Sequence, residues 1–214
     1  MQDIICRKYE EADRSAVRDI VWETAFMGEP ADIFFSGKEI LADFLTLYFT
    51  DYEPRSCFVA EADSRVVGYL IGAKDRFLLE RVFKYRIALP LLARSILQGI
   101  FLKKKNLKLI FYICCSLFRG ELRMADLSRD YPATLHINIR ANFRNLGIGS
   151  RLISAYLSYL KEQGINGVSL ATMSEQGKRF FLSRDFHLLQ QYRRSYFSYI
   201  LGRDTTVYIY GKRL

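Results

Sequence analysis

Cysteine is scarce in this chain, with four residues among 214, and their positions exclude two common uses of the thiol. Cys114 and Cys115 are neighbours in the chain, and adjacent cysteines rarely pair with each other. Neither these two nor Cys6 and Cys57 have the spacing of metal ligands. We therefore expect reduced core thiols in a cytoplasmic protein, with no disulfide framework and no metal centre.

Long apolar stretches are also absent. No run of about 18 or more uncharged apolar residues occurs, so a transmembrane helix is not expected. The first residues, Met1 to Ile4, lack the basic-then-apolar pattern of a signal peptide. The sequence shows no internal repeat, low-complexity tract or obvious linker, and half of its residues are hydrophobic. We therefore expect a single domain over residues 1–214 with a packed core.

Acidic residues are rare in one segment. Between Lys74 and Arg123 there are twelve Lys or Arg residues but only three Asp or Glu residues, whereas the rest of the chain carries equal numbers of each sign. The net charge of +9 therefore belongs to this segment. Such a segment can steer an anionic partner, but a solvated face of amphipathic helices is the simpler explanation. No recognised nucleic-acid-binding motif accompanies the charge, so nucleic acid is not an expected partner.

The hydrophobic pattern predicts an α/β fold. We expect strands at 4–9, 56–62, 65–73, 135–139, 167–172, 188–199 and 205–212, and helices at 10–26, 37–48, 148–163 and 175–183. Asp63 and Ser64 form a two-residue link that suits a hairpin, and Gly164 supplies a helix stop. Gly202 to Asp204 is expected to join the last two strands. The strand–helix–strand order across residues 135–172 implies parallel neighbours and a right-handed crossover.

Residues 75–129 interrupt this alternation with a helical insert. Residues 107–118 are apolar almost all round, which predicts a buried helix. We expect two or three helices that pack on each other and over one edge of the sheet, with Lys103, Lys104 and Lys105 in a connection between them. The alternative is an insert that rests on a membrane surface, because Lys and Arg around Leu, Ile and Phe are typical of interfacial helices.

The clearest functional pattern lies where a strand turns into a helix. An apolar strand ends at Ile139, the turn from Arg144 to Gly149 follows, and a periodic helix begins at Ile148. The first helical turn exposes N–H groups that have no partner inside the helix, and the positive end of the helix dipole favours phosphate. Gly147 and Gly149 let the backbone approach a ligand without a side chain in the way. The sequence therefore predicts a phosphate site here.

The run Arg144-Asn145-Leu146-Gly147-Ile148-Gly149 resembles the Arg/Gln-x-x-Gly-x-Gly/Ala signature of GNAT-type N-acetyltransferases. The resemblance covers about residues 135–186 and, more weakly, residues 4–72, which look like the family's opening βααββ. Residues 131–138 are also similar to the acetyltransferase-like domain associated with O-GlcNAcase. The resemblance implies a GNAT fold, with a mixed central sheet of about seven strands, flanking helices and the insert between strands 3 and 4. It also implies direct transfer of the acetyl group of acetyl-CoA to a primary amine of a small molecule or peptide in a ternary complex.

The same resemblance implies a set of site residues. A main-chain N–H at Ile139 would bond the thioester oxygen, and residues 137–139 would bond the pantetheine arm through their backbone. The pyrophosphate would take N–H groups from residues 144–150, and the Arg144 side chain would add a charged contact. The residues expected to contact acetyl-CoA are Ile137, Asn138, Ile139, Arg144, Asn145, Leu146, Gly147, Ile148, Gly149, Ser150, Ser174 and Phe181.

The acceptor side is less well defined. In the family, the two helices before the first hairpin cover the acceptor pocket, so the residues that can line it, or simply pack there, are Phe26, Met27, Glu29, Phe34 and Phe35. An alkylamine has a pKa near ~10 and needs to lose a proton before it attacks. His136 is the best-placed base, unless it is a hydrogen-bonded core residue, because strand alternation leaves open whether it faces the acceptor. Glu29 and Glu61 are weaker candidates that can equally be surface residues.

Phe181 departs from the family pattern. Residues 174–186 resemble the segment Asn-x-x-Ala-x-x-x-Tyr-x-x-x-Gly-Phe, in which the Tyr usually protonates the leaving CoA thiolate, but Phe181 has no proton to give. Ser174 stands at the Asn position and Asp185 at the Gly position. Tyr192 or Tyr196 can substitute as the acid. The departure keeps a second function open, a non-catalytic domain that binds acyl-CoA as a sensor or interaction module. The acceptor and the oligomeric state are not determined by the sequence.

Overall fold

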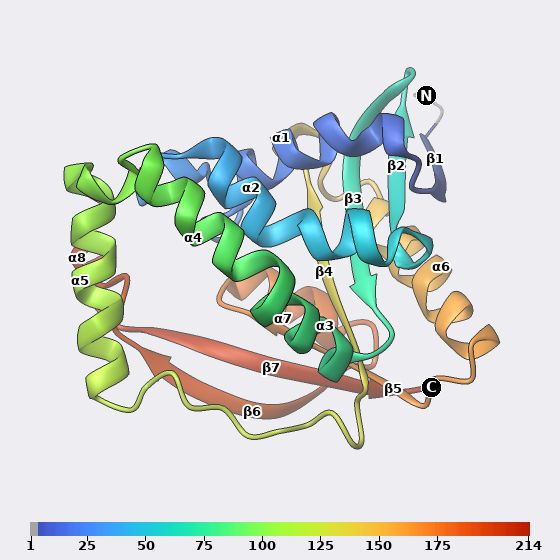
Figure 1. Cartoon of the computed structure of the whole chain (residues 1–214). Helices are drawn as coiled ribbons and strands as arrows, with labels where there is room; N and C mark the ends of the chain where they lie inside the picture. Colours follow the sequence, from blue (N-terminus) through green and yellow to red (C-terminus); the bar gives the residue numbers. More distant parts are fainter. Residues whose placement is uncertain (1–3) are drawn as a thin grey trace.

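The computed structural model describes residues 4–214, which form a single mixed sheet with helices on both sides (Figure 1). The sheet has seven strands in the order β1-β2-β3-β4-β5-β7-β6. The strands are β1 (Ile4–Lys8), β2 (Phe58–Ala62), β3 (Arg65–Ala73), β4 (Ala133–Ile139), β5 (Gly167–Thr172), β6 (His187–Arg194) and β7 (Thr205–Arg213). Only β4 and β5 pair in parallel, and every other neighbouring pair is antiparallel. The predicted mixed α/β fold with about seven strands is confirmed.

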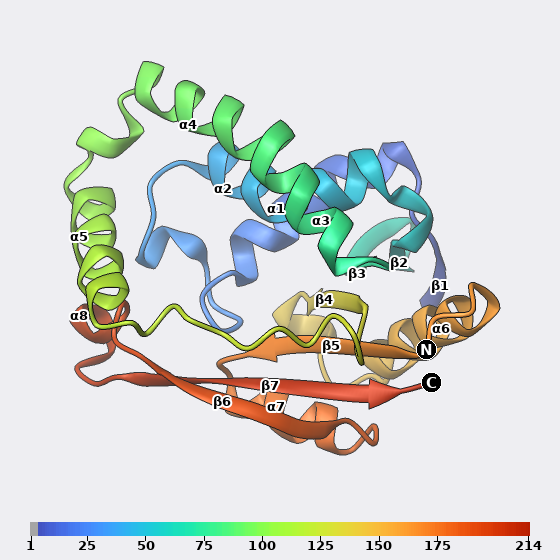
Figure 2. The same cartoon turned by 60° about the horizontal axis from the view of Figure 1, so that its bottom comes forward.

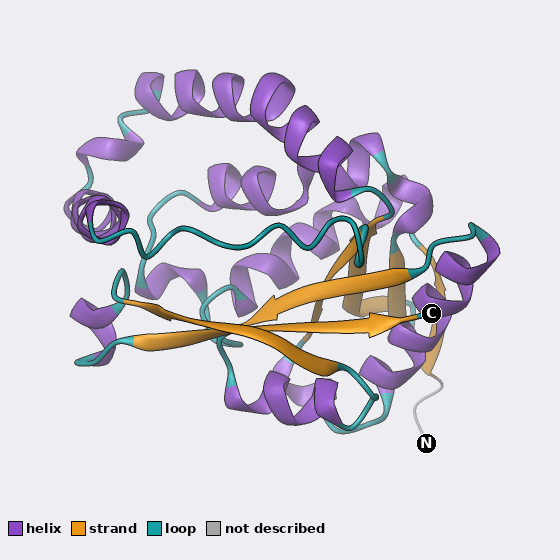
Figure 3. Ribbon diagram, turned by 90° about the horizontal axis from the view of Figure 1, so that it is seen from below, coloured by secondary structure: helices purple, strands orange, loops and turns teal. Residues whose placement is uncertain are grey.

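Helices cover both faces of the sheet, as the view from below shows (Figure 3). The helices are α1 (Arg14–Thr24), α2 (Lys38–Leu47), α3 (Arg76–Val82), α4 (Ala88–Leu97), α5 (Lys104–Phe118), α6 (Ile148–Glu162), α7 (Glu175–Leu182) and α8 (Ser198–Leu201). Side chains of β3 alternate between the two faces. Leu70 packs with α6, whereas Tyr69 and Ile71 pack with α1.

The predicted turns of the first hairpin and of the central helix are confirmed. β2 and β3 are joined by Asp63 and Ser64, whose φ angles are 49° and 60°. Positive φ at both residues is the geometry of a type I′ turn, which matches the twist of the two strands. Gly164 follows α6 with a φ of 70°, as a left-handed residue after a helix end does.

The predicted sixth strand was wrong beyond Arg194. The chain turns at Ser195, and α8 follows. The Ser195 N–H and hydroxyl donate to Glu121 Oε2 at 2.8 and 2.9 Å, and the Phe197 ring packs on Phe26 at 5.1 Å between centroids. These contacts come from residues distant in the chain, and they override the local strand pattern.

The insert contains three helices, α3, α4 and α5, within the predicted two or three, but it lies mainly on other helices rather than over one edge of the sheet. Leu91 of α4 packs with Ile40 of α2, and α5 stands beside α8 at the end of the β6–β7 pair (Figure 2). The rings of Tyr112 in α5 and Tyr199 in α8 are 4.8 Å apart. Within residues 4–214, none of the helices is both long and apolar enough to cross a bilayer.

The predicted burial of the helix at residues 107–118 was also wrong. In α5 only Asn106, Leu109 and Ser116 are buried. Residues 31–35 and α8 pack against one side of this helix, and no element of the described part of the chain covers its other side. An apolar composition therefore did not guarantee burial, because burial requires a second layer.

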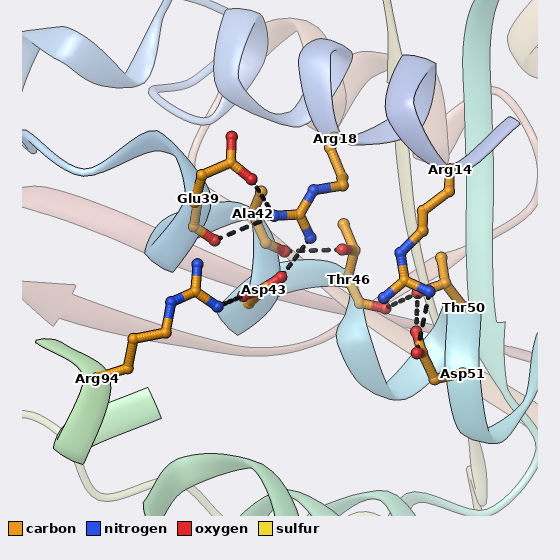
Figure 4. Close-up of polar contacts among 9 residues, drawn as sticks. All are labelled: Arg14, Arg18, Glu39, Ala42, Asp43, Thr46, Thr50, Asp51 and Arg94. Atoms are coloured by element: carbon orange, nitrogen blue, oxygen red, sulfur yellow. Dashed lines mark hydrogen bonds and ion pairs between the residues drawn. The ribbon is translucent and has the colours of Figure 1, made fainter. Parts of the chain in front are cut away.

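A buried carboxylate joins the insert to the helices beneath it (Figure 4). Asp43 of α2 accepts hydrogen bonds from Arg18 of α1 and, at 2.6 Å, from Arg94 of α4. Glu39 also accepts from Arg18, at 2.6 Å. One acidic residue thus bridges three helices from two parts of the chain.

The four cysteines are free, but they do not all lie in the core. Cys57 is buried, and burial raises the pKa of its thiol to about 12. Cys6 and Cys115 are partly buried, whereas Cys114 is exposed on α5. The expectation of core thiols is therefore wrong for Cys114, for the same reason that α5 is exposed.

Candidate functional site

The central feature of the site is a gap between β4 and β5. These two strands pair only through Ala133 with Val168 and Thr134 with Ser169. Beyond this point β4 stays paired with β3, and β5 with β7. One edge of each strand is therefore left without a strand partner, which opens the middle of the sheet.

The backbone groups of β4 alternate between β3 and this gap. The Arg140 N–H donates to the Val67 carbonyl at 2.9 Å, which fixes the alternation of the antiparallel ladder. Asn138, opposite Tyr69, then exchanges its backbone bonds with β3, whereas the peptide groups of Ile137 and Ile139 point into the gap. The backbone role expected for Ile137 and Ile139 fits this geometry, but the one expected for Asn138 does not.

The helix that begins at the mouth of the gap has an uncapped N-terminus. Gly147 precedes α6 with a φ of 76°, and no side chain caps the helix. The first backbone bond of the helix runs from the Arg151 N–H to the Gly147 carbonyl at 3.2 Å. The N–H groups of Ile148, Gly149 and Ser150 therefore have no partner within the helix, and they can bind an anion.

The two glycines of this turn have different roles. A side chain on Gly147 would meet nothing within 4 Å, so the positive φ alone accounts for glycine there. A Cβ on Gly149 would come within 2.9 Å of the Phe180 ring of α7. Gly149 thus allows α6 and α7 to approach each other, and the role expected for it, access for a ligand, is not the main constraint.

The gap and the helix terminus open into one cavity of about 540 Å³. The α1 end, β4, the turn before α6, β5 and α7 all contribute to its wall. The predicted residues that line it are Ile137, Asn138, Ile139, Arg144, Asn145, Gly147, Ile148, Gly149, Ser150, Ser174, Phe181 and His136. Leu146 is the exception, because its side chain is exposed on the outside of the turn.

His136 faces the α1 side of the sheet, which settles the alternative left open by the sequence. Its Nδ1 lies 3.2 Å from the Tyr69 hydroxyl, which accepts a hydrogen bond from Asn138 Nδ2 at 2.9 Å. Tyr69 can therefore donate its own proton to Nδ1, which leaves the imidazole proton on Nε2. Burial lowers the pKa of His136 to about 4, so the ring is neutral at pH 7.

The Arg144 guanidinium is engaged within the protein. Its Nε donates to the Ile139 carbonyl at 3.0 Å, and an Nη donates to the Gly28 carbonyl at 2.8 Å. Gly28 and Met27 form the tight turn after α1, with φ angles of 99° and 56°. Arg144 was expected to contact the pyrophosphate through its charge. Its side chain instead holds the turn after α1 against the end of β4.

The two residues expected from α7 have structural partners. Ser174 caps the helix, with its Oγ accepting from the Gly177 N–H at 2.8 Å. Phe181 is buried, and its ring lies 5.5 Å from that of Phe186 and 6.4 Å from that of Tyr210. Phe181 therefore lines the cavity as part of the core.

The two candidate acids are placed very differently. The Tyr196 hydroxyl donates to Met173 Sδ at 3.5 Å, and Met173 lines the cavity. Burial raises the pKa of Tyr196, so it remains protonated in the range of ordinary assays. The Tyr192 hydroxyl instead accepts from the Ala125 N–H at 2.9 Å, beside the tail of the insert. Neither tyrosine lines the cavity itself, but Tyr196 contacts Met173, which does.

The weaker base candidates lie outside the cavity. Glu61 accepts from Arg7 at 2.7 and 2.9 Å in an ion pair on β2. Glu29 is exposed and does not line the cavity. Of the five residues expected at the acceptor pocket, Met27 alone lines the cavity among residues 4–214, whereas Phe26 and Phe34 are buried in an aromatic cluster with Phe197.

The comparisons with known proteins agree with this geometry. A family model for the acetyltransferase (GNAT) family matches residues 15–186. The chain belongs to this family. It is accordingly an acyltransferase by family, and the sequence resemblance to GNAT enzymes is confirmed. A comparison with curated proteins gave no match.

Several solved GNAT structures share the fold. The structure of SsHAT has a TM-score of 0.73 and 23% sequence identity, over 99% of this chain and 98% of that one. A polyamine N-acetyltransferase from Drosophila melanogaster has a TM-score of 0.59 at 16% identity, over 99% and 100%. The putative acetyltransferase yncA from Salmonella typhimurium, solved with its cofactor acetyl-CoA, has a TM-score of 0.58 at 14% identity, over 99% and 94%.

Sequence reasoning missed three parts of the GNAT site. Tyr69 connects His136 to Asn138, but the register of β3 against β4 that brings them together is not written in either strand. The link from Arg144 to the Gly28 carbonyl joins residues 116 positions apart and had no local signal. For Phe180 the sequence held one signal, which is Gly149: the Phe180 ring lies so close to this position that a Cβ there would clash.

Proposed function

We propose that the protein is an N-acetyltransferase that transfers the acetyl group of acetyl-CoA directly to a primary amine. One observation carries the proposal: unpaired peptide groups of β4 face a gap that ends at the uncapped N-terminus of α6. The Ile148, Gly149 and Ser150 N–H groups suit the pyrophosphate, and the Ile137 peptide suits the amide-containing pantetheine arm. None of the four cysteines lines the cavity, which favours direct attack in a ternary complex over a thiol-bound intermediate.

The residues around the gap can assist the transfer in turn. The Ile139 N–H donates to the thioester oxygen as negative charge develops there. The amine nitrogen attacks the carbonyl carbon from the side of His136 and Asn138, so that a C–N bond forms and the C–S bond breaks. The amine loses one proton to solvent, because His136, with a pKa of about 4, is a weak acceptor at neutral pH. Tyr196 protonates the leaving thiolate and is reprotonated from solvent.

The cavity favours an acceptor with a single amine. Within residues 4–214, none of the side chains that line it is Asp or Glu, whereas Arg144 and Arg184 both do so. The Drosophila neighbour is named as a polyamine N-acetyltransferase, and a polycation needs carboxylates for its further charges. A small monoamine or an uncharged peptide amine therefore fits better.

A designed charge tests the anion site. Ser150→Glu places a carboxylate at the α6 N-terminus, where it favours the helix dipole but repels a pyrophosphate. We expect an unchanged or slightly raised melting temperature and at least tenfold weaker acetyl-CoA affinity by calorimetry. Ser158→Glu, which adds the same charge to an exposed position further along α6, should leave the affinity unchanged. Equal affinities for the two variants would contradict the site.

The second candidate function is favoured by Phe181, which cannot act as an acid. A domain that binds acyl-CoA without turnover would show calorimetric binding that Ser150→Glu removes, yet no acetyl-CoA consumption with any member of an amine panel. Consumption with one or more amines, lost in Ser150→Glu, supports the transferase.

A further inference from the structure

The insert exposes an unusual amount of apolar surface. Fifteen of the twenty-two large hydrophobic side chains that are exposed within residues 4–214 lie between Phe77 and Met124. Leu97, Leu102 and Phe118 are 87%, 80% and 90% exposed. Scattered apolar residues are normal on a protein surface, but a concentration in one segment marks an interaction site.

The helices of the insert turn an apolar stripe outward. Leu89 and Ile96 of α4 are seven residues apart, which places them on one face, and both are exposed, whereas Leu92 between them also lines an apolar cavity beneath the helix. α5 has an exposed stripe of its own, formed by Leu107, Phe111 and Phe118.

The inward face of α5 is in part polar. Asn106 donates from Nδ2 to the Ile100 carbonyl at 2.7 Å, and the Ser116 hydroxyl donates to Glu121 Oε2 at 2.7 Å. A helix that packs through polar residues and leaves its apolar stripe outside is built for a second contact beyond this fold.

Basic residues flank these stripes, and the nearby acids are engaged locally. Arg86 precedes α4, Lys103 precedes α5 and Lys104 is the first residue of α5; all three are exposed. Of the three acids in the segment, Asp75 caps α3 and Glu80 pairs with Arg76 at 3.0 Å. The third, Glu121, accepts from Ser116 and Ser195. The outer surface of the insert is thus apolar and strongly positive together.

We infer that the insert docks on an anionic lipid bilayer, with the outward stripes of α4 and α5 in the interface and the flanking Lys and Arg at the headgroups. Leu, Ile and Phe enter the acyl boundary while long basic side chains reach the phosphates. A second copy of the chain would bring one positive insert against another, which disfavours it as the occupant. Nucleic acid would match the charge but leave the apolar stripes without a partner.

Vesicle sedimentation with paired variants tests this inference. We expect the full chain to sediment with phosphatidylcholine vesicles that contain phosphatidylglycerol, to stay in solution with phosphatidylcholine alone, and to be released by salt. The triple variant Arg86→Glu, Lys103→Glu and Lys104→Glu should bind about a hundredfold or more weakly. Its control makes the same charge change at Arg55, Arg65 and Lys161, which are exposed outside the insert, and should bind as the parent does.

Apolar variants separate a bilayer from a purely electrostatic partner. Replacing Leu89, Ile96 and Phe118 of the two stripes with Ser should weaken vesicle binding about tenfold or more, without loss of the fold at such exposed positions. Its control replaces Ile5, Leu182 and Leu188, exposed apolar residues outside the insert, and should change nothing. On bound vesicles, Cys114 in the α5 stripe should also react more slowly with a charged maleimide.

Four outcomes overturn the inference. The first is that the parent chain does not sediment with anionic vesicles. The second is that the apolar variant sediments with them as well as the parent does. The third is duplex DNA binding that the charge variant abolishes and the apolar variant leaves intact, which would assign the surface to nucleic acid. The fourth is that, without vesicles, light scattering gives the mass of a dimer for the parent chain and of a monomer for the apolar variant. That result would assign the surface to a second copy of the chain.

Discussion

At the scale of single residues, position in the fold decides chemistry that residue type leaves open. Histidine at position 136 looked suited to act as a base, yet its Nδ1 faces the Tyr69 hydroxyl and burial lowers its pKa to about 4. Arginine at position 144 looked suited to bind phosphate, yet it holds two backbone carbonyls. In both cases the side chain positions its neighbours, which a sequence motif does not reveal.

The lowered pKa of His136 predicts how stability depends on pH. As pH falls below about 6.5 the unfolded chain takes up a proton at this residue that the folded chain binds only near pH 4, so the folded state loses stability on acidification. Below pH 4 the lost free energy of unfolding reaches about 3 kcal/mol, at 1.36 kcal/mol per pKa unit. His136→Asn should flatten the dependence of the unfolding free energy between pH 6.5 and 4.5, measured by urea denaturation. His187→Asn, at the exposed second histidine, is the matched control.

Tyr196 gives a second prediction at this scale. Its hydroxyl is next to Met173 at the cavity wall, so Tyr196→Phe should lower kcat by about tenfold or more while the affinity for acetyl-CoA stays the same. The loss should be largest above pH 8, where solvent supplies protons least readily. Tyr192→Phe removes a hydroxyl that bonds the insert instead, and its kcat should match the parent. A Tyr196→Phe enzyme with full kcat would remove this residue as the acid.

At the scale of elements, the helices of the body and the insert are held together by charge as well as by apolar packing. Two Arg–Asp pairs join α1 to α2 and to the turn that follows α2 (Figure 4). Asp43 is 7% exposed and pairs with Arg18 and Arg94. Arg14 pairs with Asp51 at 3.0 Å, but both side chains are about one-third exposed. The same kind of ion pair therefore occurs in a buried and in a partly exposed environment along α1.

Removing each acid should separate the two environments. Asp43→Ala leaves the Arg18 charge partly buried and without its carboxylate, and should cost about 2–3 kcal/mol of unfolding free energy, somewhat less than a fully buried pair. Asp51→Ala should cost about 1 kcal/mol or less, because solvent already screens its pair. Chemical denaturation measures both. Similar losses for the two variants would contradict the view that burial sets the difference.

At the scale of the whole molecule, the sheet consists of two parts that separate from a short parallel contact. One part ends at β4 and the other begins at β5, and their pairing is limited to residues 133–134 and 168–169. A ligand that lies in the gap touches both parts, whereas α4 of the basic insert lies above α2 in Figure 2 and remains outside this contact. We therefore expect ligand binding in the gap and docking of the insert on a membrane to be separable.

Hydrogen exchange can show this division in a single experiment. In the free protein the amides of Ile137 and Ile139 should exchange faster than those of His136 and Asn138, although all four lie in β4, because only the first two face the gap. Saturating acetyl-CoA should slow exchange at Ile137, Ile139 and the start of α6, and leave α4 and α5 unchanged. Uniform protection along β4 in the free protein would contradict the proposed orientation of its peptides.

Local signals determined most of the elements, the turn at Asp63 and Ser64 and the order of the strands along the chain, and they predicted an anion site before α6, because each depends on a few neighbouring residues. The tertiary structure alone decided which face His136 occupies, that Arg144 binds carbonyls, that the sixth strand stops at Arg194, and that α5 is exposed. Each of these depends on partners far along the chain. An apolar helix is buried only where another element covers it, and no periodicity within the helix shows whether such an element exists.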